Sequence, residues 1–233
     1  MKKFSLLSAS ILIAVLTGCA STAAPKQTNA SNCNIPTSKE ENISLDLIEQ
    51  QVREKQYYSA LAYLENASTS NPRVLLLRAE AQRKTGMLTE AYSSYRDLSL
   101  TCLNAYGHAG MAKILATRGD LPHAHQQMLK ARRLAPGNAD IRNDYGFILL
   151  AHRNFKDAQR EFMTALQLQP GHPVAIRNMV MSLILDGDSR TAIRMAKNNG
   201  IDSTEFKHLL SQANTFKEPA LAGSNNTQHG APL

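Results

Sequence analysis

The chain has 233 residues and a formal net charge of +7, from 26 Lys and Arg residues against 19 Asp and Glu residues. The basic residues do not form the stripe with interleaved aromatic side chains that is typical of nucleic-acid-binding surfaces, so no nucleic-acid partner is expected. The sequence also has no Gly-rich phosphate loop, nucleophile elbow, HExxH motif or paired-cysteine motif. We therefore expect neither an enzyme nor a protein with a bound cofactor or metal.

Residues 1–18 are predicted to be a secretory signal peptide. Met1-Lys2-Lys3 is basic, and the apolar run from Phe4 to Leu16 is too short to span the ~30 Å hydrocarbon core of a membrane. The run ends in Leu16-Thr17-Gly18-Cys19, which resembles a bacterial lipobox. This resemblance implies that Cys19 is the lipidated first residue of the mature protein. An ordinary signal peptide with a chance cysteine is the alternative.

Residues 19–41 are rich in Ala, Ser, Thr and Asn, and are predicted to be a lipidated, flexible tether with a reach of roughly 25 Å. Acyl chains on Cys19 would anchor the protein essentially permanently, because each buried methylene contributes about 0.8 kcal/mol. Ala20 follows the cysteine, at the place where an aspartate favours retention in the inner membrane of many enteric-type bacteria. The resemblance therefore implies a location on the periplasmic face of the outer membrane.

Residues 42–213 repeat a unit of two amphipathic helices, most clearly in residues 138–170, where apolar residues recur at three- and four-residue steps. A small residue of the second helix recurs at spacings of 31, 33, 34 and 34 residues, as Ala60, Ala91, Ala124, Ala158 and Ala192. Four residues later the chain has Leu64, Tyr95, Met128, Phe162 and Ala196. The first helices carry Ile48, Ala79, Ala112, Gly146 and Val180. Turns are predicted at Lys55-Gln56, Gly86, Gly119-Asp120, Arg153-Asn154 and Gly187-Asp188.

The repeated pattern resembles the tetratricopeptide repeat (TPR), although no Trp occurs and the first and last units are degenerate. The resemblance implies an all-α superhelical solenoid of about five helix pairs. The short first spacing predicts a shortened first helix or a tightened connection in the second unit. Asp202-Ser203-Thr204-Glu205 resembles a capping box and predicts a C-terminal capping helix from Phe206 to Ala213. Residues 214–233 are predicted to be a disordered tail.

By resemblance to TPR domains, the first helices line an extended concave surface on which a protein partner binds. The Lys and Asn set with which chaperone-binding TPR domains hold a C-terminal carboxylate is not reproduced here. We predict a groove of mixed character for an extended or helical peptide, with binding on the convex face or an edge as the alternative. The groove-facing residues are predicted to be Arg73, Leu76, Glu80, Arg83, Tyr106, Lys113, Asn143, Phe147, Leu150, Arg177, Met181 and Ile184.

Cys33 and Cys102 are candidates for a disulfide in the oxidising periplasm. The bridge would close a loop of about 70 residues and stabilise the fold by roughly 4 kcal/mol in the chain-entropy model. A buried free Cys102 with an unpaired Cys33 is the alternative. His123 and His125 are two residues apart and so point to different sides of a helix, and no metal site is predicted from them.

The lipobox and the array together resemble the TadD family of tight-adherence (Flp) pilus proteins, most clearly in residues 142–150 and 158–166. TadD-type proteins are outer-membrane lipoproteins that help to assemble or place the pilus secretin and its accessory proteins. The resemblance implies a secretin or another pilus-assembly subunit as the partner. The alternatives are a scaffold for cell-wall enzymes or outer-membrane protein assembly, and a secretin pilotin of type IV pili. The oligomeric state stays open.

Overall fold

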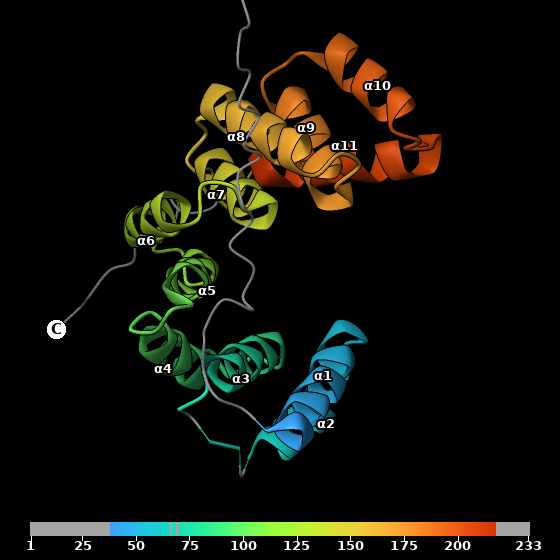
Figure 1. The fold of residues 1–233 in the computed structure, drawn as a ribbon. Helices are drawn as coiled ribbons and strands as arrows, with labels where there is room; N and C mark the ends of the chain where they lie inside the picture. Colours follow the sequence, from blue (N-terminus) through green and yellow to red (C-terminus); the bar gives the residue numbers. More distant parts are fainter. Residues whose placement is uncertain (1–37, 66, 69, 218–233) are drawn as a thin grey trace, which may run out of the picture.

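The structure is a computed structural model that describes residues 38–65, 67–68 and 70–217. These residues form eleven α-helices and no strand (Figure 1), and none of these helices is long and apolar enough to cross a membrane. The predicted signal peptide, Cys19, Cys33 and residues 218–233 lie outside the described residues. The helices are α1 (Lys39–Arg53), α2 (Tyr57–Leu64), α3 (Pro72–Lys84), α4 (Leu88–Leu98), α5 (Asn104–Thr117), α6 (Leu121–Leu134), α7 (Ala139–Ala151), α8 (Phe155–Leu168), α9 (Pro173–Leu185), α10 (Ser189–Asn198) and α11 (Ser203–Lys217).

The helices stack as pairs along one direction, from α1 and α2 at one end to α10 and α11 at the other (Figure 1). Each odd-numbered helix from α3 to α9 contacts the next odd-numbered helix, and no pair of even-numbered helices packs to the same extent. The first helices of the units therefore lie on the inner, concave side of the curved stack, and the second helices lie on the outer side. This arrangement confirms the predicted all-α TPR solenoid.

Small residues in the second helices allow neighbouring helices to approach closely, and large residues fill the space beside them. The recurring alanines from Ala60 to Ala192 are all fully buried. In the best-matching unit, a Cβ added at Gly146 of α7 would lie 2.6 Å from Cε1 of Phe162 in α8. Phe162 is itself fully buried. The spacing of small and large residues in the sequence therefore predicts where the helices cross.

The turns within the units lie where the sequence predicts them. The backbone adopts a positive φ at each predicted position, at Lys55, Gly86, Gly119, Arg153 and Gly187. Helices α3, α6 and α9 are capped at their starts, since the side chains of Asn71, Asp120 and His172 each accept a hydrogen bond from a backbone N–H of the first turn.

Gly86→Ala should lower the free energy of unfolding by about 1–2 kcal/mol, because φ at this position is +84° and an L side chain is disfavoured there. Nothing lies within 4 Å of the added Cβ, so the cost is conformational and not steric. Gly137→Ala is the control, since its Cβ also meets nothing and its φ is not positive. Chemical denaturation should show a change of less than about 0.5 kcal/mol for the control. Equal losses in the two variants would contradict this account of the turn.

The irregular first spacing arises in α2 and not in the first helix of the second unit. Helix α3 has 13 residues, as do α7 and α9, whereas α2 has only 8 residues. The carbonyl oxygens of Leu64, the last residue of α2, and of Ala67 in the connection that follows accept hydrogen bonds from the Arg78 guanidinium, at 2.5 and 3.2 Å. Helix α1 also begins earlier than predicted, at Lys39, after the N-cap Ser38.

The last helix begins at Ser203, three residues before the predicted Phe206, and ends at Lys217, beyond the predicted Ala213. The Asp202 side chain accepts hydrogen bonds from the backbone N–H groups of Thr204 and Glu205, which confirms the capping residue. The helix then continues to Lys217, so residues 214–217 are helical and not part of a tail. Phe216 belongs to this helix, and its ring contacts Phe147 of α7.

Candidate functional site

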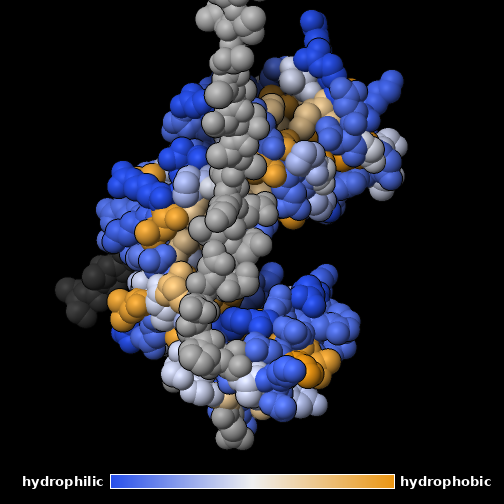
Figure 2. Space-filling model, in the orientation of Figure 1, coloured by the Kyte–Doolittle hydropathy of each residue, from blue (hydrophilic) through white to orange (hydrophobic). Residues whose placement is uncertain are grey.

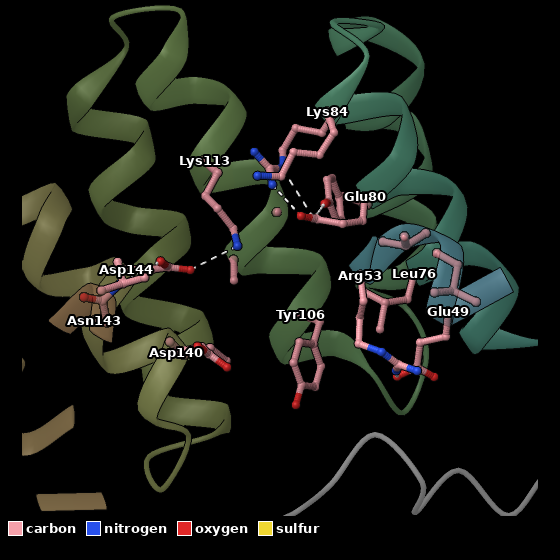
Figure 3. A pocket seen from close by; sticks show the side chains of 18 of the residues that line it. Glu49, Arg53, Leu76, Glu80, Lys84, Tyr106, Lys113, Asp140, Asn143 and Asp144 are labelled. Atoms are coloured by element: carbon pink, nitrogen blue, oxygen red, sulfur yellow. Dashed lines mark hydrogen bonds and ion pairs between the residues drawn. The ribbon is translucent and has the colours of Figure 1, made fainter. Parts of the chain in front are cut away.

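The concave side holds a cavity of about 590 Å³ that residues from α1, α3, α5 and α7 line, together with the start of α9. Figure 3 shows side chains from these helices pointing into one shared space. Figure 2 shows the surrounding face as largely hydrophilic, with a hollow between the α1–α3 end and the α9–α11 end of the stack. The cavity residues that were predicted from sequence are Arg73, Leu76, Glu80, Arg83, Tyr106, Lys113 and Asn143.

Glu80 of α3 is an acidic group of this cavity that has two hydrogen-bond donors. Its carboxylate accepts hydrogen bonds from the Tyr95 hydroxyl at 2.5 Å and from Arg83 Nη2 at 2.5 Å. Burial alone would raise the pKa of Glu80, but the charges of Lys113 and Arg83 and the two hydrogen bonds outweigh it and lower this pKa to about 2. Burial and the neighbouring carboxylate raise the pKa of Tyr95 well above its usual value. Glu80 is therefore ionised at neutral pH, and Tyr95 is protonated.

Lys113 of α5 lies between the charged residues of α3 and those of α7 in this cavity. Its Nζ lies 3.0 Å from Oδ2 of Asp144 in α7. The charge of Asp144 raises the pKa of Lys113, burial opposes this, and the charge of Glu80 adds to it. The sequence of charges Arg83, Glu80, Lys113 and Asp144 thus alternates in sign across three successive first helices. Because these charges satisfy one another, the floor does not favour a strongly charged ligand.

The N-terminal wall of the cavity is fixed by Arg73 of α3. Its Nη2 donates hydrogen bonds to Oδ1 of Asp46 and to Oε2 of Glu49 in α1, both at 2.8 Å. Beside these ion pairs, Leu76 and Tyr106 are half-buried and line the same cavity. The Tyr106 hydroxyl accepts a hydrogen bond of 3.0 Å from Nδ2 of Asn138, which orients its ring. These two side chains supply apolar contact area next to a paired, polar floor.

The remaining predicted groove residues lie farther along the concave face. Phe147, Arg177 and Met181 line a second cavity, of about 730 Å³, between α7, α9 and α11. Asn143 is almost fully buried, and its Oδ1 accepts a hydrogen bond of 2.9 Å from Nδ2 of Asn178 in α9. This hydrogen bond connects a residue of the 590 Å³ cavity, Asn143, with a residue of the 730 Å³ cavity, Asn178.

The prediction for Leu150 is wrong. Leu150 is fully buried in the core, and Ile184 is 7% exposed and belongs to the same core. Leu150 follows Phe147 by three residues, which rotates it about 60° around the helix axis. On α7 the buried stripe is wide enough that this rotation moves the side chain out of the groove and into the packed interior.

Sequence reasoning missed several residues of the cavity. Glu49 and Arg53 belong to α1, whose unit is degenerate, so the repeat pattern gave no register for them. Asp140 and Asp144 of α7 were also missed. A signal for Asp144 existed, because it precedes Phe147 by three residues and therefore shares its helix face.

The structure describes Cys102 of the predicted disulfide and both histidines, His123 and His125. Cys102 is disulfide-bonded, whereas its predicted partner Cys33 lies outside the described residues, so the pairing stays a prediction. His123 Nδ1 lies 2.8 Å from Asp120, and His125 Nε2 lies 3.1 Å from the Tyr145 hydroxyl. Within the part of the chain that the structure describes, no group of three or more His, Cys, Asp or Glu residues could hold a metal ion.

No protein-family model matches the chain. Over 212 residues it is 28% identical to TPR repeat-containing protein PA4299 of Pseudomonas aeruginosa, and the alignment covers 91% of this chain and 85% of that protein. The structure is similar to that of TTC0263, a thermophilic TPR protein of Thermus thermophilus, with 18% identity, a TM-score of 0.62 and coverage of 76% of this chain and 98% of that chain.

The structure is also similar to that of YrrB, which is described as a TPR protein with an unusual peptide-binding site. Here the identity is 16%, the TM-score is 0.51, and the match covers 71% of this chain and 89% of that chain. The stacked helix pairs, the buried repeat positions and these similarities agree on one architecture. The chain is a tetratricopeptide-repeat protein by fold.

Proposed function

We propose that this protein is a non-enzymatic scaffold that binds a segment of a protein partner in the concave groove. The observation that carries the proposal is the 590 Å³ cavity, which four successive first helices line and which the sequence-predicted residues reach. Leu76 and Tyr106 give it apolar contact area, and the paired charges of its floor orient polar groups. Cavities of this size are typical of ligand sites.

A peptide suits this surface better than a small charged molecule does. The acidic groups Glu49, Glu80 and Asp144 already face basic partners at 3.0 Å or less, so an added ionic ligand would have to break existing pairs. A peptide brings neutral backbone groups and side chains of mixed character instead. The peptide-binding site that is described for YrrB is consistent with this kind of ligand on the same fold.

The finer proposal concerns location and partner. Acyl chains on Cys19 would hold the array at the periplasmic face of the outer membrane, and residues 19–37 would give it range. The partner would be a secretin or accessory subunit of a tight-adherence (Flp) pilus apparatus, as the resemblance to the TadD family implies. Such a scaffold needs no catalytic step, since raising the local concentration of its partner is sufficient.

A cross-linking pulldown tests this proposal. The full lipidated protein would be captured from native envelopes after mild cross-linking, and its partners would be identified by mass. A secretin or pilus-assembly subunit in the eluate would support the finer proposal. Peptidoglycan enzymes or outer-membrane assembly factors would replace it with a general periplasmic scaffold. Recovery of no protein partner would contradict both.

Tyr106→Ala should lower the yield of the captured partner at least ten-fold, because aromatic side chains at the centre of an interface carry much of its affinity. Tyr106→Phe is the matched control, since it keeps the ring and removes only the hydrogen bond with Asn138. We expect Tyr106→Phe to retain most of the binding, as measured by quantitative mass spectrometry of the eluate. An equal loss in the two variants would mean that the ring is not a contact.

A further inference from the structure

Helix α11 departs from the stacking that the other helices follow. In the preceding units each second helix packs against the next first helix, as α4 does with α5, α6 with α7 and α8 with α9. Helix α11 instead packs mainly against α9 and has no comparable contact with α10. In Figure 1 it lies behind α9 and reaches toward α7. Its C-terminal half therefore lies on the concave side of the array.

The contact that holds α11 is apolar. Leu209 and Ala213 are buried, and the Phe216 ring meets the Phe147 ring edge-on, with 6.4 Å between the ring centroids. The three α11 residues have the i, i+4, i+7 spacing of one helix face. Among the described residues, the polar contact between α11 and the rest of the array is the Arg177–Glu205 ion pair at 3.1 Å, whose side chains are 45% and 41% exposed. Such an exposed pair contributes little, so the apolar contacts provide most of the interaction that holds α11 in place.

Helix α11 leaves open space between itself and helices α7 and α9. Between it and α7 and α9 is the 730 Å³ cavity, which Val174, Met181 and Leu209 line together with both phenylalanines. A third cavity, of about 410 Å³, adjoins Phe147 and Phe216 and also includes Arg83, Lys113 and Asp144. Arg83, Lys113 and Asp144 also line the 590 Å³ cavity, to which α11 contributes no residue. Phe216 therefore lies between two parts of the groove. One part is the 590 Å³ cavity along α1, α3, α5 and α7, and the other is the 730 Å³ cavity along α7 and α9, which we call the α7–α9 section.

We propose that α11 is an intramolecular occupant of the α7–α9 section of the groove and that an amphipathic helix of the partner displaces it. The proposal rests on the proposed function, since it assumes that the concave face binds a protein segment. It adds the class of segment, because α11 itself demonstrates a fit to a helix with apolar residues at the spacing of Leu209, Ala213 and Phe216. Its departure would join the three cavities into one groove from α1 to α9.

A peptide-binding experiment tests the displacement. The probe is a fluorescent synthetic peptide with the sequence of residues 203–217, and the control peptide carries Phe216→Ala. The proteins are the full wild-type chain, Leu209→Asp/Phe216→Asp to undock α11, and the matched control His208→Asp/Asn214→Asp on the exposed side of α11. We expect the probe to bind the undocked variant at least ten-fold more tightly than the other two, because the tethered helix competes at a high effective concentration. Equal binding to all three proteins, or binding to none, would overturn the proposal.

Hydrogen exchange on the full chain tests the docking of α11 without the doubly substituted variant, and so applies even if that variant does not fold. In the wild type, the amides of residues 206–217 should exchange at least ten-fold faster than those of α9. Phe216→Ala should increase this difference without changing α7 or α9. Equal protection of α11 and α9 would identify α11 as a fixed cap.

The outcomes of the two proposals are separable. Partner capture that depends on Tyr106, without peptide binding, would refute the displacement of α11 and leave the proposed function intact. Peptide binding by the undocked variant without any captured partner would show that an amphipathic helix fits the α7–α9 section and would contradict the proposed partner-binding function.

Discussion

Replacing Gly146 with Leu should lower the free energy of unfolding by about 3 kcal/mol, the upper end of the usual cost of overpacking. A single Cβ at this position would already lie 2.6 Å from the ring of Phe162. Phe162 is fully buried, so its ring has no free space to move into. Neither α7 nor α8 can shift without disturbing the units on both sides. Urea denaturation followed by circular dichroism measures the loss.

A double-mutant cycle separates this contact from a general effect of the leucine. Phe162→Ala removes the ring and should cost about 3–5 kcal/mol by itself. In Gly146→Leu/Phe162→Ala the leucine enters the vacated space, so the double variant should be more stable than the sum of the single losses predicts. Strict additivity would mean that Gly146 and Phe162 do not meet and that the alignment of this unit is wrong.

Glu80→Gln should destabilise the protein by about 3 kcal/mol at pH 7. The pKa of Glu80 is about 2 in the folded protein against an ordinary 4.5, and each unit of difference corresponds to about 1.4 kcal/mol. Because the folded-state pKa is lowered, the carboxylate stabilises the fold fully above pH 4.5. This contribution is lost as the pH falls from about 4.5 to about 2. Gln also leaves the Arg83 guanidinium without its anionic partner.

Denaturation at a series of pH values checks this prediction. The wild type should lose about 3 kcal/mol more than Glu80→Gln does over that acidic range. Glu90→Gln is the control, because Glu90 is an exposed residue of α4 and should change stability by less than about 0.5 kcal/mol at pH 7. Parallel pH profiles for the wild type and Glu80→Gln would contradict the account of the cavity floor.

The repeat positions and turns were predictable because they depend on local rules. A buried alanine such as Ala158 marks a helix crossing, and a positive φ at Gly119 or Gly187 marks a turn. These features recur with the period of the unit, so several weak signals reinforce one another. The groove positions on α3 and α5 followed from the same register.

The details that failed depend on how the units are placed relative to one another. Leu150 has the sequence spacing of a groove residue, but the width of the buried stripe on α7 decides its exposure. The ion pair between Lys113 and Asp144 joins residues that are 31 positions apart in different units, and no local pattern predicts it. Such contacts require the curvature of the stack.

Helix α11 shows a further limit of local reasoning. Its capping residue Asp202 was evident, but the composition of residues 214–233 predicted a disordered tail that begins at Asn214. The apolar face of Leu209, Ala213 and Phe216 predicts burial without naming the surface it meets. That choice is made by Phe147, which is 39% exposed and contacts Phe216.

Site-specific photo-cross-linking in native envelopes tests the central claim most directly. A photoreactive amino acid would replace Tyr106 on the concave side or Met163 of α8, an apolar residue of a second helix that is 46% exposed. Binding in the concave groove predicts a cross-linked partner from position 106 and none from position 163. A partner that cross-links from position 163 and not from position 106 would place binding on the convex face and contradict the proposed function.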